Sequence, residues 1–173
     1  GGLKKTFFCN AGAEAVANAI KMARLVTGRS KIVSYYGSYH GSTGEGRDAS
    51  GDPRHNIHGP RATGFVHVYG PTTYRCPLGY TDGAPVELYL QHVRDTILQE
   101  GPETVAAIIA ETVTGSNGLF IRPPGYLQGL RELADEFGIL LILDEVMCGF
   151  GRTGKMFACE HYGVVPDMLV LAK

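Results

Sequence analysis

The sequence predicts an α/β domain in which a mostly parallel sheet carries helices on both faces. Short runs of consecutive apolar residues alternate along the chain with longer segments whose apolar residues recur at helical spacing. Continuous apolar runs are typical of strands buried on both faces, and such strands belong to parallel sheets. Because parallel strands need long crossover connections, the alternation itself indicates a doubly wound architecture.

The first half of the chain predicts one helix, two strands and two long loops. The helix ends before Gly28, which suits the left-handed position past a helix end. Loops longer than about 12–15 residues in a compact domain usually carry function, so both loops are candidates for ligand binding. The helix is predicted at 13–27, the strands at 31–36 and 65–68, and the loops at 37–64 and 70–80.

The second half predicts two helices and three buried strands. Gly101 and Gly138 close the helices, and Pro123-Pro124 precedes the second of them. The helices are predicted at 86–99 and 126–137, and the strands at 105–110, 139–143 and 168–171.

The composition is that of an ordinary globular domain of 173 residues, with 44% apolar and 19% charged residues. A net charge of −1 gives no electrostatic basis for binding nucleic acid or a membrane surface. No apolar run approaches the roughly 18–20 residues of a membrane span. Four cysteines without a C-x-x-C pair predict reduced thiols in a cytoplasmic protein. His55 and His58 lack the context of a zinc motif, so no metal site is expected.

Both ends of the chain resemble those of a truncated sequence. The chain begins Gly-Gly without a methionine, and it stops at Lys173 directly after an apolar run. We therefore expect a fragment of a longer protein, and a transit peptide ahead of Gly1 stays open as an alternative.

The segment LLILDEVMCGFGRTGKMF, residues 140–157, offers two hints of an ATPase. Asp144-Glu145 resembles the acidic strand end that holds magnesium, and 149–155 fits the phosphate loop G-x-x-x-x-G-K. However, Met156 stands where that loop needs Ser or Thr, and only a short segment follows where a long helix is required. Both hints also lie on one strand and its exit, whereas nucleotide hydrolases take them from different strands. We therefore expect no ATP site.

Polar residues stand at the carboxyl ends of the predicted strands. They are residues 34–40, Glu111, Asp144 and Lys173. In open parallel sheets, ligands bind beyond this edge. These residues should therefore converge on one crevice.

Two glycine-containing motifs border the expected crevice. In NAGAEA, Gly12 opens the first helix, whose free N–H groups can bind an anion. Taken alone, a plain helix start explains this motif better. In YYGSYHGST, an aromatic ring between glycines can lie flat on a planar ligand, and an exposed turn explains this motif equally well.

Asp144 and Lys173 complete the set. Each would be costly to bury without a partner. A carboxylate can keep a pyridine nitrogen protonated so that the ring absorbs electrons, and a lysine can bind an aldehyde as an imine. Lys173 alone is better explained as an ordinary strand-end lysine. An anion cradle, a ring stacker, a ring acid and an imine-forming lysine together indicate pyridoxal phosphate.

With these motifs the sequence resembles the class III, or omega-type, aminotransferases of the fold type I pyridoxal phosphate enzymes. The resemblance extends over the whole chain and rests on GAEA, YHG, GDPR and DEVMCGFGRTGKMFACEHYGVVPDMLVLAK, which ends on the family's cofactor lysine. YRCPLGY is similar to the taurine–pyruvate and omega-amino acid–pyruvate branch. The resemblance implies that 1–173 form the central part of the cofactor-binding large domain, without its N-terminal segment and C-terminal small domain.

The resemblance also implies how the cofactor would be bound. Gly12 and Ala13 would give backbone N–H groups to the phosphate. Tyr39 would stack on one face of the ring, and Val146 would pack on the other.

The chemically active positions follow from the same resemblance. Asp144 would pair with the ring nitrogen, and Lys173 would hold the aldehyde. Glu111 matches a family glutamate near the site and is expected among the cofactor-binding residues, without a catalytic role.

Three positions depart from the family pattern. Ala11 stands where many relatives have Ser or Thr, Met147 where many have Gln, and Thr112 where Pro is usual. A hydroxyl to the phosphate and an amide to the ring hydroxyl are therefore in doubt.

The implied function is a pyridoxal phosphate-dependent aminotransferase. It would move an amino group from an amine or omega-amino acid to a keto acid, with pyruvate expected as the acceptor. The resemblance also implies a homodimer with a shared active site. Two alternatives stay open, namely an aminomutase of the same fold and a non-catalytic fragment of the cofactor domain.

Overall fold

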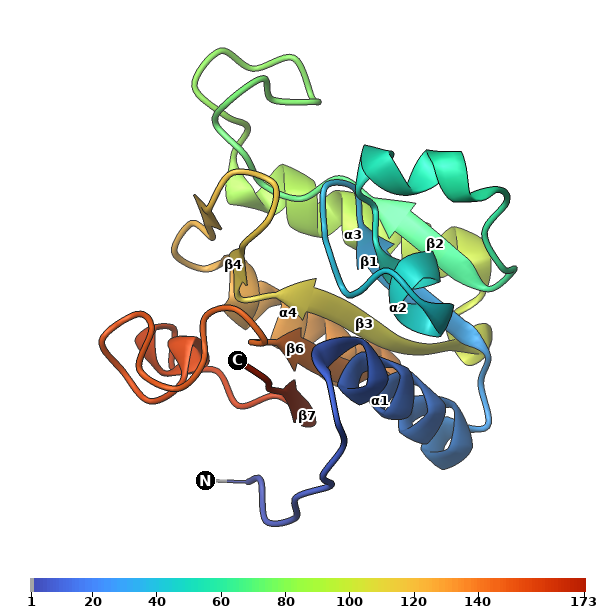
Figure 1. The fold of residues 1–173 in the computed structure, drawn as a ribbon. Helices are drawn as coiled ribbons and strands as arrows, with labels where there is room; N and C mark the ends of the chain where they lie inside the picture. Colours follow the sequence, from blue (N-terminus) through green and yellow to red (C-terminus); the bar gives the residue numbers. More distant parts are fainter. Residues whose placement is uncertain (1) are drawn as a thin grey trace.

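The computed structural model describes residues 2–173 and shows a five-stranded sheet with helices on both faces (Figure 1). The strand order is β2-β1-β3-β6-β7, and each neighbouring pair is parallel. Every residue of β3 is buried, as expected of the central strand. The predicted α/β architecture is therefore confirmed. The strands are β1 (Lys31–Tyr35), β2 (Phe65–Val68), β3 (Val105–Glu111), β6 (Leu140–Asp144) and β7 (Met168–Val170).

Helices cover both faces of the sheet (Figure 1). On one face, α1 buries Val16 and Ile20 in a cluster with Ile109 of β3, and α2 adds Ala49 to it. On the other face, α3 and α4 enclose the second apolar cluster. The helices are α1 (Gly12–Thr27), α2 (Gly44–Ala49), α3 (Val86–Glu100) and α4 (Tyr126–Phe137).

The predicted element ends agree with the structure within one residue, but the predicted loop 37–64 is wrong in part. It contains α2 and a 3-10 helix, η1 (Pro53–His58). The α2 sequence GEGRDA has two glycines and no apolar periodicity, so packing on α1 stabilises this helix more than local propensity does. Also unpredicted are the 3-10 helix η2 (Pro102–Thr104) and the hairpin of β4 (Val113–Thr114) and β5 (Phe120–Ile121).

The parallel register brings the polar strand ends to one edge of the sheet. Glu111 of β3 pairs with Asp144 of β6, and Asp144 pairs with Val170 of β7. The start of α1 borders the same edge, because Gly12 and Asp144 line one cavity. Among the described residues, no helix combines the length and the apolar character that a membrane crossing needs.

Candidate active site

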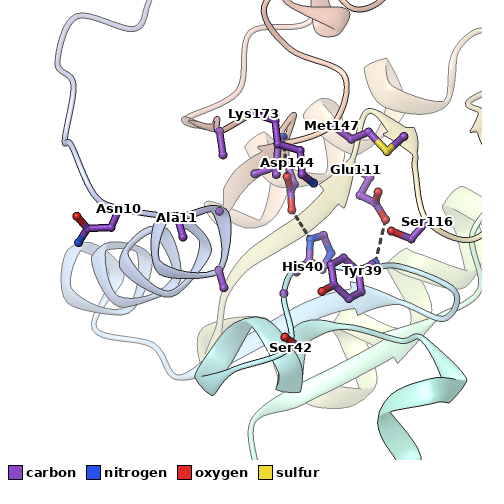
Figure 2. Close-up of a pocket in the computed structure, with 15 residues that line it drawn as sticks. Asn10, Ala11, Tyr39, His40, Ser42, Glu111, Ser116, Asp144, Met147 and Lys173 are labelled. Atoms are coloured by element: carbon purple, nitrogen blue, oxygen red, sulfur yellow. Dashed lines mark hydrogen bonds and ion pairs between the residues drawn. The ribbon is translucent and has the colours of Figure 1, made fainter.

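A cavity of about 410 Å³ opens at this edge of the sheet (Figure 2). Its walls come from the start of α1, the segment after β1, the ends of β3 and β6, and the segment after β7. The strand ends therefore converge on one crevice, but of the predicted segment 34–40 only Tyr39 and His40 line it. The cavity is lined by every residue predicted for the site, namely Gly12, Ala13, Tyr39, Glu111, Asp144, Val146 and Lys173.

Asp144 is buried in the cavity wall with two defined partners. Its Oδ1 accepts the Val146 amide at 2.9 Å, and its Oδ2 lies 2.7 Å from Nδ1 of the buried His40. Since an ionised carboxylate only accepts hydrogen bonds, Nδ1 of His40 carries the proton of this bond. Nε2 of His40 has no partner among the described residues. The two partners hold Asp144 in one orientation, and its remaining lone pairs stay available to a ligand.

Glu111 is a second buried carboxylate beside Asp144. Its Oε1 accepts the Tyr39 amide at 2.9 Å, and its Oε2 accepts the Gly115 amide at 2.8 Å. Burial raises the pKa of Glu111 above the ordinary glutamate value, and the charge of Asp144 adds to the rise. The charge of His40 and the two amide hydrogen bonds act in the opposite direction.

The start of α1 approaches the cavity closely and without a side-chain cap. The N-cap residue, Ala11, makes no side-chain hydrogen bond to the helix, and the first amides of a helix have no acceptor within it. A Cβ on Gly12 would lie 2.9 Å from Cγ1 of Val146, so glycine is required for this approach. A Cβ on Gly41 would likewise lie 2.7 Å from Cβ of Ala13. The Gly12 and Ala13 amides are thus placed to bind an anion.

Lys173 and Tyr39 lie at different parts of the cavity. Figure 2 shows Lys173 beside Asp144, and Tyr39 below Glu111 and next to His40. Lys173 is exposed and Tyr39 is partly buried. The Tyr39 ring meets the His55 ring edge to face, with centroids 5.6 Å apart. An amine and an aromatic ring therefore border the same cavity as the buried acids.

Glu145, the neighbour of Asp144, holds the following loop and does not line the cavity. It is fully buried. Its carboxylate accepts hydrogen bonds from the Thr112 hydroxyl at 2.9 Å and from the Ala158 and Cys159 amides at 2.7 Å each. The hydroxyl of Thr112 thus has a defined role at a position that departs from the family pattern.

The loop 149–155 lacks the geometry of an ATP phosphate loop. It is followed by a four-residue 3-10 helix, η3 (Ala158–His161), in place of a long helix. Nζ of Lys155 donates to the Glu160 carbonyl at 3.0 Å and so serves the loop itself. Among the side chains that the structure describes, no group of three or more His, Cys, Asp and Glu is placed to hold a metal ion.

His40 belongs to the polar segment 34–40 that the sequence places at the crevice, but its contact with Asp144 was not predicted. The YHG motif drew attention to the ring of Tyr39, and the histidine beside it received no role. A signal exists, because His40 follows a strand end in a sheet whose other strand ends carry acids. Ala11 and Met147, two of the positions that depart from the family pattern, also line the cavity. The remaining lining residues, for which no role was predicted, are Asn10, Gly41, Ser42, Ser116 and Ala172.

The groups around the cavity fit a flat, phosphorylated ligand with a basic ring nitrogen and an aldehyde. The open amides of α1 suit the phosphate, and the fixed carboxylate of Asp144 suits a protonated nitrogen. Lys173 supplies the amine that an aldehyde requires. All three groups line the same cavity, as the binding of one ligand demands.

Comparison with known proteins covers the whole chain. A family model described as aminotransferase class-III matches residues 1–173. A probable aminotransferase of Mycobacterium tuberculosis is 38% identical in an alignment of 181 positions, which covers 100% of this chain and 39% of the relative.

Two solved structures share the fold. Taurine:2-oxoglutarate aminotransferase of Bifidobacterium kashiwanohense, in complex with PLP and glutamate, is 50% identical with a TM-score of 0.90, covering 96% of this chain and 38% of that one. An (S)-enantioselective omega-transaminase of Thermomicrobium roseum is 40% identical with a TM-score of 0.88, covering 95% and 38%. The chain therefore spans well under half the length of these relatives.

Proposed function

The chain belongs to the class-III aminotransferase family, and on this premise we propose that it forms the central part of the cofactor-binding domain of a pyridoxal phosphate-dependent aminotransferase. The enzyme moves an amino group from an amine or omega-amino acid to a keto acid. The observation that carries the proposal is the meeting of Lys173, Asp144 and the start of α1 at one cavity.

When bound, pyridoxal phosphate supplies an electron-accepting ring that weakens the bonds at the carbon bearing the substrate amino group. Lys173 would hold the aldehyde carbon and, once a substrate amine displaces it, move a proton at its Nζ. Asp144 would accept a hydrogen bond from the ring nitrogen and keep that nitrogen protonated. Nδ1 of His40 lies 2.7 Å from Oδ2 of Asp144. This contact keeps the carboxylate in the orientation that the ring nitrogen requires.

The other lining residues would bind and orient the cofactor. The amides of Gly12 and Ala13 would hold the phosphate at the start of α1. Tyr39 and Val146 would cover the two faces of the ring and exclude water from it. These four residues line the cavity from three separate segments, which supports the binding of one rigid ligand.

The acceptor that we propose is pyruvate, since YRCPLGY resembles the omega-amino acid–pyruvate branch. The competing acceptor is 2-oxoglutarate, which the name of the Bifidobacterium relative contains. The names of the relatives described above refer to transfer between molecules. They favour transfer over the rearrangement within one molecule that an aminomutase performs.

We also propose a homodimer with a shared active site and a cytoplasmic location. Large apolar side chains such as Phe8, Ile57 and Ile121 are exposed in this chain, and an assembled enzyme would cover side chains of this kind. The cysteines are free. Burial raises the pKa of the Cys148 and Cys159 thiols to about 12, in keeping with thiols that stay reduced.

Borohydride trapping in the full-length protein tests the proposed function. Reduction fixes the cofactor on the lysine that holds it, and peptide mass spectrometry should place the adduct on Lys173, which lines the cavity. Lys155 is an internal control, because its amine donates a hydrogen bond to the Glu160 carbonyl in η3 and Lys155 does not line the cavity. An adduct on Lys155, or no adduct, would contradict the proposal.

The substrate class is tested with an amine donor and each keto acid in turn. Alanine formed from pyruvate would support the proposed acceptor, and glutamate formed from 2-oxoglutarate alone would replace it. A rearranged amino acid formed without any keto acid would instead identify an aminomutase.

A further inference from the structure

We propose that Glu111 is a positioning residue that ties Tyr39 to the segment 112–118 and so fixes the wall of the cavity on which a ring would lie. The proposal rests on the proposed function, because Tyr39 is taken as the ring-stacking residue. Glu111 acts here through main-chain contacts and needs no contact with a substrate.

Both oxygens of the Glu111 carboxylate are engaged by main-chain amides. Oε1 accepts the Tyr39 amide at 2.9 Å, and Oε2 accepts the Gly115 amide at 2.8 Å. Tyr39 follows β1, whereas Gly115 follows β4. One side chain therefore joins two segments that are far apart in the sequence.

The main chain of Glu111 is itself held in place. It ends β3 in register with Asp144 of β6, and its carbonyl accepts a hydrogen bond from Nε of the buried Arg122 at 3.3 Å. The carboxylate thus transmits the position of the sheet to both segments. Figure 2 shows Glu111 between Tyr39, Ser116 and Met147.

A second contact joins the same two segments. Nδ2 of Asn117 donates to the Gly37 carbonyl at 2.6 Å and also lies 3.4 Å from Oδ2 of Asp52. Glu111 and Asn117 therefore act on one unit, which consists of the segment after β1 and the segment 112–118.

An ionised carboxylate suits the Glu111 contacts best. Both partners are N–H donors, and the ionised acid offers each of them an oxygen that only accepts. In Glu111→Gln the side chain has almost the same shape, but its NH₂ group must face one of the two amides. Two facing donors cannot bond, so one of the two contacts is lost.

The test compares Glu111→Gln with Glu103→Gln in the full-length holoenzyme. Glu103 is exposed just before β3, at the other end of the strand. Hydrogen–deuterium exchange at single-residue resolution reads the Tyr39 and Gly115 amides, and visible circular dichroism reads the asymmetry around the bound cofactor. We expect exchange at one or both amides to accelerate about tenfold or more in Glu111→Gln, together with a weaker visible band. We expect no change in Glu103→Gln.

Each outcome decides a separate point. Unchanged exchange at both amides in Glu111→Gln overturns the proposal. Faster exchange with an unchanged visible band overturns the positioning role and leaves only a structural contact. A parent protein without an adduct on Lys173 refutes the proposed function, while amide exchange still tests the contacts. If Glu111→Gln does not fold, Glu111→Asp decides, because its shorter carboxylate keeps the charge but cannot reach both amides. Unchanged exchange at both amides in Glu111→Asp also overturns the proposal.

Discussion

Asp144 is held between the Val146 amide and the His40 ring, and this arrangement makes an asparagine substitution informative. Asn is nearly isosteric, so Asp144→Asn should leave the fold and the adduct on Lys173 intact. A neutral amide does not keep a ring nitrogen protonated, so the half-reaction with an amine donor should slow about 100-fold or more, as when other preorganised electrostatic partners are removed. Stopped-flow absorbance on the full-length enzyme measures this rate.

Asp135→Asn on α4 is a matched control, because Asp135 is exposed and its Oδ1 pairs with Arg131 at 2.8 Å on the same helix. Its half-reaction rate should stay at the parent value. A rate for Asp144→Asn within a few-fold of the parent would show that Asp144 is only a structural acid.

Single residues differ in how far the sequence predicts their place. Asp144 directly follows an apolar run, so its position at the edge of the sheet can be predicted from the local sequence alone. His40 touches Asp144 across 104 residues of sequence, and no local pattern records that contact. Glu145 could not be assigned its loop-holding role for the same reason. Its partners come from two other segments of the chain, and they are Thr112, Ala158 and Cys159.

At the scale of elements, the start of α1 is shaped by its fit against Val146. Alanine favours a helix over glycine by about 0.5–1 kcal/mol, so Gly12→Ala should strengthen α1 if propensity alone decided. Its Cβ would, however, lie 2.9 Å from Cγ1 of the stiff Val146 side chain. We expect displacement of this wall and cofactor release about tenfold faster, a loss of about 1.4 kcal/mol, measured by the absorbance of free cofactor after dilution.

Gly2→Ala is the control for Gly12→Ala, since its Cβ would lie 3.5 Å from Val165, an ordinary contact. Equal release rates in Gly12→Ala and the parent would mean that the approach of α1 to Val146 is not what holds the cofactor.

Elements with a continuous apolar or periodic pattern were predictable, and those without one were not. The sequence of β3 predicts a buried strand because it is a continuous apolar run up to Glu111, and all of its residues are buried. α2 escaped prediction because its six residues depend on α1 for packing. The hairpin of β4 and β5 escaped because its two-residue strands are too short to show alternation.

At the scale of the whole molecule, two buried acids make folding stability depend on pH with opposite signs. The Arg54 side chain lowers the pKa of Asp52 by hydrogen bonding, so Asp52 stabilises the fold above the ordinary aspartate pKa, near about 3.9, and this stability is lost as pH falls through the lower folded pKa. Glu111 has a raised pKa. Its contribution is largest below the ordinary glutamate pKa, near about 4.3, and is lost as pH rises through the folded pKa.

Replacing the partner of Asp52 tests the acid branch of this dependence. Arg54→Met should make acid unfolding begin at higher pH than in the parent, because the folded pKa of Asp52 returns toward its ordinary value. The difference should vanish at pH values below both pKa values. Urea unfolding at a series of acidic pH values measures it. Arg75→Met, an exposed arginine that lies over Tyr74, is the control, and an equal shift in both variants would contradict the assignment to Asp52.

The strand order β2-β1-β3-β6-β7 also has a meaning in time. On the ribosome, β1 is made early, but its neighbour β3 pairs Val105 with Lys31 only after the long stretch between them has been synthesised. Until then the apolar strand β1 lacks its partner β3. An unpaired strand edge of this kind is prone to aggregation and is a target for chaperones. Gly12 is among the first residues of the cavity to be translated and Lys173 the last. The proposed cofactor would therefore find all of these lining residues only after the whole span from Gly12 to Lys173 has been synthesised.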